Sequence, residues 1–304
     1  MLKAKLKVKL KIMFERQLLR RLSLLALIIV PAIASADIAV NPTATDELPA
    51  AIVGFGGGLR GTDLSYFDGN PAAKGYLAVP ASTNDTPRGA VILIHEWDGL
   101  TERVRQTADA FAAEGYVALA ADLYGGKTGS NREENMVLVN ASLADMPQIV
   151  SNLDAAANYL KGRADVNGKV ATIGWCYGGG VALSFAMGND NHEGTAIFYG
   201  RLLDDPEAMQ HIHHEVYGTF AGQDKGIPPA KVDAFVAAMR KAGIPNDVHI
   251  YDEVNHGFWL HVDRDPNVNQ GPALDAWQRL KGYLQRTVGS AAAGTAPADS
   301  ATPM

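Results

Sequence analysis

A glycine-rich turn, Gly-Trp-Cys-Tyr-Gly-Gly-Gly at residues 174–180, follows an apolar run that is rich in β-formers (170–175) and precedes a helix-compatible segment (181–187). Glycines on both sides of Cys176 permit a sharp strand-to-helix turn and close packing of the helix on the strand. Such a turn exposes one side chain at its apex, and here it is the thiol of the only cysteine among 304 residues. We therefore predict a nucleophile. The alternative is a small buried apolar residue, the usual role of a lone cysteine.

Strand and helix patterns alternate through most of the chain. The first two predicted strands, 61–68 and 72–79, are separated by Asp-Gly-Asn-Pro and should form an antiparallel hairpin. Further strands are predicted at 89–95, 116–122, 170–175, 194–199, 215–221 and 247–251, and helices at 101–114, 146–160, 181–187, 231–242 and 273–288. Residues 125–134 are expected to form a polar loop. This order predicts an α/β fold with a mostly parallel central sheet, an antiparallel N-terminal edge and helices on both faces.

Residues 1–36 have the composition of a signal peptide. Lys and Arg are frequent up to residue 21, residues 22–30 are apolar apart from Ser23, and Ala-Ser-Ala at 34–36 is a cleavage signal. The apolar run is short for a membrane span, so removal is favoured over an uncleaved anchor. Translation from Met13 is an alternative start. We expect export, most simply to the periplasm, with one domain at 37–288 and a disordered tail at 289–304.

Charge and composition limit the kinds of binding partner that we expect. Residues 1–36 carry eight of the 27 basic and one of the 33 acidic residues, which leaves a net charge of −13 on the remainder. Such a surface repels phosphate backbones, so we do not expect a nucleic acid partner. The cluster at 211–215, His-Ile-His-His-Glu, matches no standard metal-ligand spacing and is predicted to be a solvated loop. We therefore predict a small-molecule substrate, with neither metal nor cofactor.

Four polar residues come shortly after predicted strands, at the edge where functional groups gather in parallel sheets: Glu96, Cys176, Asp224 and His256. The order nucleophile, acid, histidine is that of α/β-hydrolase triads. His256 would take the proton of the thiol, and Asp224 would fix the imidazole tautomer. Taken singly, the Asp is an ordinary turn residue, the His an ordinary loop residue and Glu96 a carboxylate at a helix start.

Further residues at the same edge of the sheet are predicted to contribute to the site. The backbone N–H groups of Tyr177 and Trp97 would form an oxyanion hole, since each follows a strand-end residue of the site. We expect His95, Tyr124 and Phe258 to line the substrate site.

These residues resemble the dienelactone hydrolase family over about residues 60–288. The matching motifs are Ala-Val-Pro at 78–80, His-Glu-Trp-Asp-Gly at 95–99, Ala-Asp-Leu-Tyr-Gly at 121–125, Gly-Trp-Cys-Tyr-Gly-Gly-Gly at 174–180, Gly-Gln-Asp at 222–224 and His-Gly-Phe at 256–258. The resemblance implies an α/β-hydrolase fold, hydrolysis of an ester or lactone through an acyl-thioester, and a triad of Cys176, Asp224 and His256. It also implies that Glu96 pairs with the resting thiol.

The chain departs from the family at two positions. The family's type enzyme holds its substrate's carboxylate with two arginines, and here Gly125-Gly126 and Leu260 stand in their places. Arg201 and Arg264 are the other candidates for this contact. The sequence leaves open the substrate, the oligomeric state and the presence of a lid. Two alternatives to an enzyme also remain at this point: a non-catalytic small-molecule binder on the same fold, and a thiol redox sensor that would need a partner thiol.

Overall fold

The computed structural model describes residues 48–54, 57–81 and 86–289. These ranges belong to one compact unit that begins at Glu47. The predicted signal peptide (1–36), the start of the predicted domain (37–47) and residues 290–304 of the predicted tail lie outside the described residues. No helix within the described ranges is long and apolar enough to cross a membrane.

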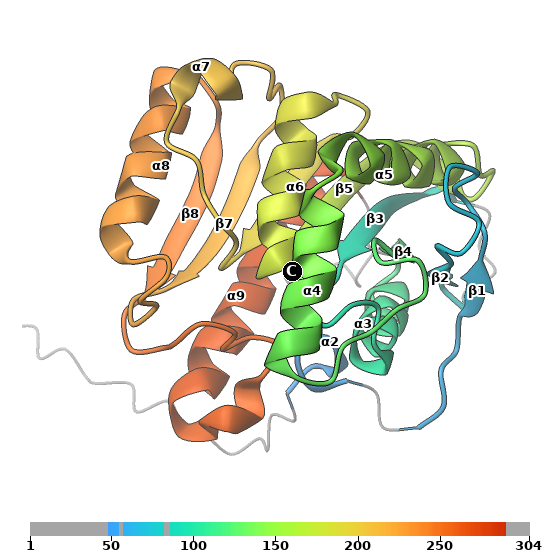
Figure 1. Cartoon of the computed structure of the whole chain (residues 1–304), viewed down its shortest axis with the longest axis horizontal. Helices are drawn as coiled ribbons and strands as arrows, with labels where there is room; N and C mark the ends of the chain where they lie inside the picture. The colour runs from blue at the N-terminus through green and yellow to red at the C-terminus, as the bar shows by residue number, and fades with distance from the viewer. Residues whose placement is uncertain (1–47, 55–56, 82–85, 290–304) are drawn as a thin grey trace, which may run out of the picture. The chain divides into compact units, whose positions relative to one another are not determined.

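Eight strands form a single sheet in the order β1-β2-β4-β3-β5-β6-β7-β8 (Figure 1). Their bounds are Thr62–Leu64 (β1), Gly75–Ala78 (β2), Arg88–Ile94 (β3), Val117–Ala121 (β4), Val166–Trp175 (β5), Gly194–Phe198 (β6), Val216–Ala221 (β7) and Asn246–Tyr251 (β8). β2 pairs antiparallel with both β1 and β4, and all other neighbours pair parallel. The predicted α/β fold, with its mostly parallel sheet and antiparallel N-terminal edge, is confirmed.

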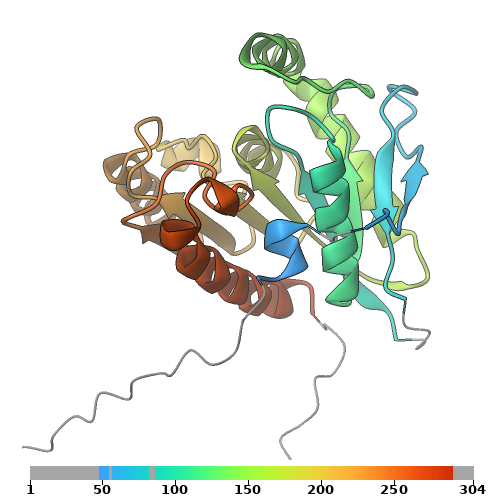
Figure 2. The same cartoon turned by 90° about the horizontal axis from the view of Figure 1, so that it is seen from below.

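Helices cover both faces of the sheet. Their bounds are Ala50–Val53 (α2), Glu102–Ala113 (α3), Arg132–Leu143 (α4), Met146–Lys161 (α5), Tyr177–Gly188 (α6), Pro206–Met209 (α7), Pro229–Lys241 (α8) and Pro266–Thr287 (α9), with a 3₁₀ turn at Val262–Arg264 (η1). α3 and α9 pack on one face, and short α2 lies between them (Figure 2). α5, α6 and α8 pack on the other face.

The central strand β3 shows why the sheet is buried between these layers. All of its residues are buried, and successive side chains point to opposite faces. Val91 and Leu93 pack in the core beneath α3 and α9, whereas Ala90, Ile92 and Ile94 pack beneath α5 and α6. A strand buried on both faces favours apolar residues, and all but Arg88 and Gly89 of β3 are apolar. The carboxyl end of β3 is therefore held rigidly at the edge of the sheet where the candidate site residues gather.

Two helices differ from the prediction. α4 starts at Arg132, within the expected polar loop, with the side chain of Asn131 as its N-cap. α9 begins seven residues before its predicted start and contains Pro272 in its interior. The predicted N-cap of α5 is confirmed, because the side chain of Asp145 accepts a hydrogen bond from the N–H of Gln148.

Candidate active site

Cys176 lies at the apex of the turn between β5 and α6. Its backbone has φ 53° and ψ −113°, a left-handed conformation that is strained for a residue with a side chain. The turn is held by a hydrogen bond from the N–H of Cys176 to the carbonyl of Phe198 on β6, at 3.0 Å. The thiol side chain is half-buried, so it is supported and yet accessible. This is the geometry expected of a nucleophile elbow.

Glycines around the elbow permit the close approach of α6 to the sheet. A Cβ on Gly178 would lie 2.2 Å from the carbonyl oxygen of Ile94 at the end of β3. A Cβ on Gly174 would lie 2.1 Å from the carbonyl oxygen of Gly178. Both contacts are with backbone atoms, which cannot move aside as a flexible side chain would. The glycine pattern of the sequence is therefore explained by strand–helix packing.

His256 and Asp224 meet at the ends of β8 and β7. Nδ1 of His256 lies 2.6 Å from Oδ2 of Asp224. The other carboxylate oxygen, Oδ1, accepts hydrogen bonds from the N–H groups of Gly226 at 2.8 Å and Ile227 at 3.1 Å. The Asp224 side chain is only 5% exposed, and its three hydrogen bonds fix its orientation. The sequence predicted that these two residues would come together, and the structure places them in direct contact.

The pKa values of this pair follow from the contacts. Burial by itself would lower the pKa of His256, but hydrogen bonds to Asp224 and to Cys176 and their charges outweigh it and raise that pKa to about 10. Burial would raise the pKa of Asp224, whereas His256 and the two backbone N–H groups lower it below its ordinary value. The imidazole therefore lies between the thiol and the carboxylate and interacts with both.

Glu96 has a partner that the sequence did not indicate. Its Oε2 lies 2.8 Å from Nε2 of His261, and its side chain is 8% exposed. The hydrogen bonds among the described residues do not include one from this carboxylate to the Cys176 thiol, the pairing implied by the family resemblance. Burial and the charge of Glu96 raise the pKa of neighbouring Asp98 to about 6, an effect that His261 opposes.

Tyr199 is a further residue of the site that the sequence analysis did not single out. It directly follows β6, is fully buried, and has a positive φ of 39°. Its ring packs on that of His256 with centroids 5.0 Å apart, and its hydroxyl accepts the N–H of Leu260 at 3.4 Å. Strained conformations of this kind persist where the surroundings fix them, often at functional sites. Tyr199 therefore supports one face of the His256 imidazole.

The two residues expected to supply the oxyanion donors, Trp97 and Tyr177, line the same cavity as Cys176. Tyr177 is the first residue of α6, so its N–H has no acceptor within the helix. The hydroxyl of Tyr177 is 2.6 Å from Oγ of Ser142, a hydrogen bond that ties α4 to the elbow.

The cavity that begins at Cys176 has a volume of about 530 Å³. It extends between α4, α6 and the loop that follows β6. Most of its lining is apolar: Met136, Val139, Leu143, Met146, Val181, Leu183, Met187, Leu202 and Leu203. Arg201 also lines it and is exposed, so one of the two arginines considered from the sequence does lie at the cavity.

The three residues expected to line the substrate site lie behind the residues that line this cavity or beside the imidazole: His95 and Tyr124 pack on Tyr177, and Phe258 packs on Tyr199. His95, Tyr124 and Phe258 are buried and are not in the lining of the 530 Å³ cavity. His95 donates from Nδ1 to the carbonyl of Glu96 at 2.6 Å and accepts the N–H of Leu123 at Nε2. It supports the backbone of the site. The sheet edge and the site loops bury these three residues, and their contact with a substrate stays a prediction.

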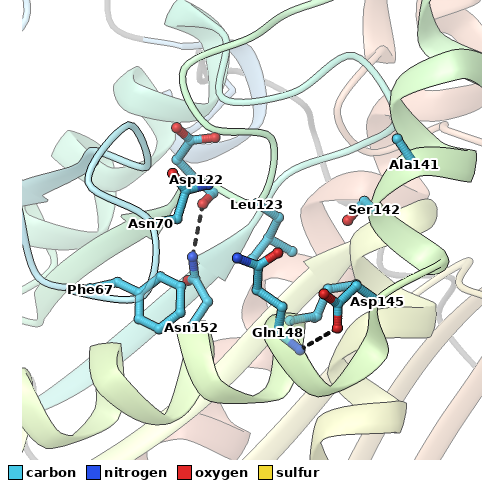
Figure 3. A pocket seen from close by; sticks show the side chains of 10 residues that line it. Phe67, Asn70, Asp122, Leu123, Ala141, Ser142, Asp145, Gln148 and Asn152 are labelled. Carbon is cyan, nitrogen blue, oxygen red and sulfur yellow. Dashed lines mark hydrogen bonds between the residues drawn. The ribbon is translucent and has the colours of Figure 1, made fainter.

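A smaller cavity of about 40 Å³ lies behind α4 (Figure 3). Ser142 of α4, Asp122 after β4 and Asn152 of α5 are among its lining. The Asn152 side chain donates to the carbonyl of Asp122 at 3.1 Å and so closes one side of it. This space suits water rather than a substrate.

The residue types present give no sign of a metal centre. Within 48–54, 57–81 and 86–289, no three His, Cys, Asp or Glu side chains gather as a metal ion would require. The predicted solvated loop is correct for His211 and His213, which are exposed. It is wrong for His214, whose Nε2 lies 2.8 Å from Oγ1 of Thr195 in a partly buried position.

Comparison with known proteins identifies the family. The model of the dienelactone hydrolase family matches residues 73–288. The chain belongs to the dienelactone hydrolase family. A relative from Methylorubrum extorquens named carboxymethylenebutenolidase is 30% identical over 225 residues, which cover 69% of this chain and 76% of the relative. One of the same name from Saccharolobus solfataricus is 29% identical and covers 74% of this chain and 98% of its own length.

Solved structures show the same fold. A dienelactone hydrolase-like promiscuous phosphotriesterase from metagenomic libraries superimposes with a TM-score of 0.67, over 77% of this chain and 100% of its own. Its sequence is 21% identical, so this likeness concerns the fold alone. In this dienelactone hydrolase family member, the sequence motifs located the catalytic candidates. They gave no indication of His261, Tyr199 or Ser142, whose contacts join distant parts of the chain.

Proposed function

We propose that this dienelactone hydrolase family member hydrolyses carboxylic esters or lactones through an acyl-thioester on Cys176. The observation that carries the proposal is the 2.6 Å contact of His256 Nδ1 with a buried carboxylate, while the same ring interacts with a thiol on a strained elbow. Membership of a hydrolase family supports it. A lone structural cysteine would need neither the strained turn nor the imidazole.

The reaction would proceed in two halves. His256 takes the proton of Cys176, whose sulfur forms a bond to the carbonyl carbon while the carbonyl π electrons move to oxygen. The N–H groups of Tyr177 and Trp97 bind this oxyanion. On collapse the C–O bond to the leaving group breaks, and the imidazolium donates its proton to the departing oxygen. In the second half water attacks the thioester carbonyl and its proton passes to His256. The C–S bond then breaks, the acid is released, and the imidazolium returns the proton to the sulfur of Cys176.

The electrostatics of the triad match this sequence of steps. Because its pKa is raised to about 10 beside Cys176 and Asp224, His256 holds the proton of the thiol as an imidazolium next to the thiolate until a leaving group accepts it. Asp224 balances the positive charge and fixes the tautomer that leaves Nε2 directed at the thiol. Alkoxide leaving groups of activated esters and lactones are expelled more readily than amines, so we propose ester rather than peptide substrates.

The test compares wild type with Cys176→Ala and Glu96→Gln on p-nitrophenyl butyrate. We expect no turnover above background from the first variant and reduced turnover from the second. A slow ester should leave one acyl group on the wild-type protein, detectable by intact mass and absent from Cys176→Ala. Undiminished hydrolysis by Cys176→Ala would contradict the mechanism. Oxidation of the thiol by peroxide that a reductant reverses, without any ester turnover, would instead indicate a redox sensor. Small-molecule binding without an adduct would indicate a binding protein.

We also propose that the protein is exported and loses residues 1–36. N-terminal sequencing of the protein recovered outside the cytoplasm should give Asp37 as the first residue. A mature chain that retains residues before Asp37 would contradict this proposal.

A further inference from the structure

The lining of the 530 Å³ cavity determines which part of a substrate it can accept. Four elements supply its apolar walls: α4, the first residue of α5, α6 and the loop after β6. Of the polar residues in the lining, Arg201 is exposed to solvent, and two others are already satisfied within the protein. The hydroxyl of Ser184 donates to the carbonyl of Gly180 at 2.9 Å, and that of Tyr177 is bonded to Ser142. Such walls favour an apolar ligand, because a polar one would lose its hydrogen bonds to water without replacement.

The position of His256 indicates which part of the substrate lies in the cavity. The leaving group must lie at this imidazole, because the imidazolium donates the proton to it. His256 and Tyr199, which packs on it, are absent from the lining of the 530 Å³ cavity, whereas Cys176 and the residues of the two expected oxyanion donors are part of it. The cavity therefore extends from the carbonyl carbon on the side away from the leaving group. That side holds the acyl group.

We infer that the cavity binds an apolar acyl chain of medium length, such as an octanoyl group. This inference rests on the proposed ester hydrolysis and names its substrate class. A volume of 530 Å³ lies in the range that accommodates ligands much larger than an acetyl group. Three methionines, Met136, Met146 and Met187, contribute to the walls, and their flexible side chains adapt to chains of different shape.

The experiment measures kcat/KM for p-nitrophenyl acetate, butyrate and octanoate below their aggregation limits. Burial of each added methylene should raise kcat/KM about three- to fourfold where it is fully enclosed. We expect octanoate to exceed acetate by at least tenfold. Val139→Asp places a charge in the lining and should reduce this octanoate-to-acetate ratio about tenfold. Val137→Asp is the matched control on the same helix, since Val137 is 67% exposed and outside the lining; it should keep the wild-type ratio.

Failure of the inference and failure of the proposed function give different results. Turnover that is highest with acetate, with a ratio unaffected by Val139→Asp, overturns the acyl-chain site and leaves ester hydrolysis intact. Absence of turnover with every ester overturns the hydrolysis, and binding of free octanoate then decides the inference. Octanoate that raises the melting temperature of wild type more than butyrate does, with the difference lost in Val139→Asp, supports the site. Equal effects of the two acids overturn it.

Discussion

Two histidines, His192 and His214, should make the stability of the fold sensitive to acid. They lie near the start of β6, at the opposite end of this strand from the active site. Nε2 of His192 and Nε2 of His214 lie 3.1 Å and 2.8 Å from the same hydroxyl, Oγ1 of Thr195. The rings contact each other with centroids 4.6 Å apart, and His192 also stacks on Phe185. Nδ1 of His192 is buried and has no hydrogen-bond partner among the described residues. A proton added to His192 would therefore place a positive charge in a buried position with few hydrogen-bond partners to stabilise it.

The size of the effect follows from the pKa values. Burial, helped by the charges of His214 and Lys161, lowers the pKa of His192 to about 3. Burial lowers that of His214 to about 4, with Glu193 opposing and His213 assisting. In the unfolded chain both would titrate near pH 6.5. The unfolded state therefore binds more protons as pH falls, so stability is complete above pH 6.5 and is lost below it. At pH 5 each histidine should cost about 2 kcal/mol, at 1.36 kcal/mol per pH unit.

The assay is urea unfolding of wild type and His192→Gln at pH 7.5 and pH 5.0. Glutamine can still hydrogen-bond to Thr195 but does not titrate. The free energy of unfolding of the variant should therefore fall about 2 kcal/mol less between the two pH values than that of wild type. The comparison uses the change with pH, because loss of the ring stack on Phe185 lowers the variant's stability at both. His211→Gln, at an exposed position, controls for removal of a histidine.

The reasoning is refuted if wild type and His192→Gln lose the same free energy on acidification. It is also refuted if His211→Gln shows the reduced loss as well, since the effect would then not depend on burial. A loss of about 2 kcal/mol is large against the 5 to 15 kcal/mol that is typical of a domain.

Two further predictions concern the site. Asp224→Asn presents an amide N–H to Nδ1 of His256, which favours the tautomer with its proton on Nε2, so kcat for p-nitrophenyl butyrate should fall about 10³- to 10⁴-fold; a fall of less than tenfold would contradict the assigned role. Because the pKa of Asp224 is lowered, this carboxylate stabilises the fold at neutral pH and loses that effect in acid, so the variant should show a flatter acid limb in thermal unfolding. His261→Ala leaves the buried carboxylate of Glu96 without its partner and should cost about 1 to 3 kcal/mol in urea unfolding. A double-mutant cycle with Glu96→Gln that gives no coupling would exclude a contribution from this pair.

The central strands could be predicted because their burial determines their composition. β3 is buried at every position and consists mainly of apolar residues, which a strand inside two helical layers requires. The elbow was predictable for a related reason, because Gly174 and Gly178 are demanded by backbone contacts. Where a local structural requirement determines the residue type, the structure can be predicted from the sequence.

α4 and the start of α9 could not be predicted in the same way. α4 buries only Asn135, and its apolar residues at helical spacing, Met136, Val139 and Leu143, line the cavity rather than the core, so they do not mark the segment as a core-packed helix. α9 was expected to begin after Pro272, since an internal proline usually breaks a helix. Its flanking turns are retained because residues such as Trp277 are fully buried against the sheet. Tertiary packing thus overrides the local signal.

Side-chain pairing between distant segments was the other unpredictable part. Glu96 and His261 are separated by 165 positions, and no spacing rule connects them. The same holds for Arg201, which approaches the cavity only because the loop after β6 passes the start of α6.

The hydrogen bond between Ser142 and Tyr177 joins two parts of the protein with different tolerance to change. Cys176, Asp224 and His256 come from strand ends in a tightly packed sheet, where a substitution endangers folding. α4 forms one wall of the cavity and buries a single residue. Mutations can therefore accumulate in α4 at little cost in stability, and those at its lining positions, Met136, Val139 and Leu143, reshape the cavity beside an unchanged set of reacting groups. The chain contains a region in which substrate preference can evolve separately from chemistry, and residues 132–143 are where directed evolution toward new esters should begin.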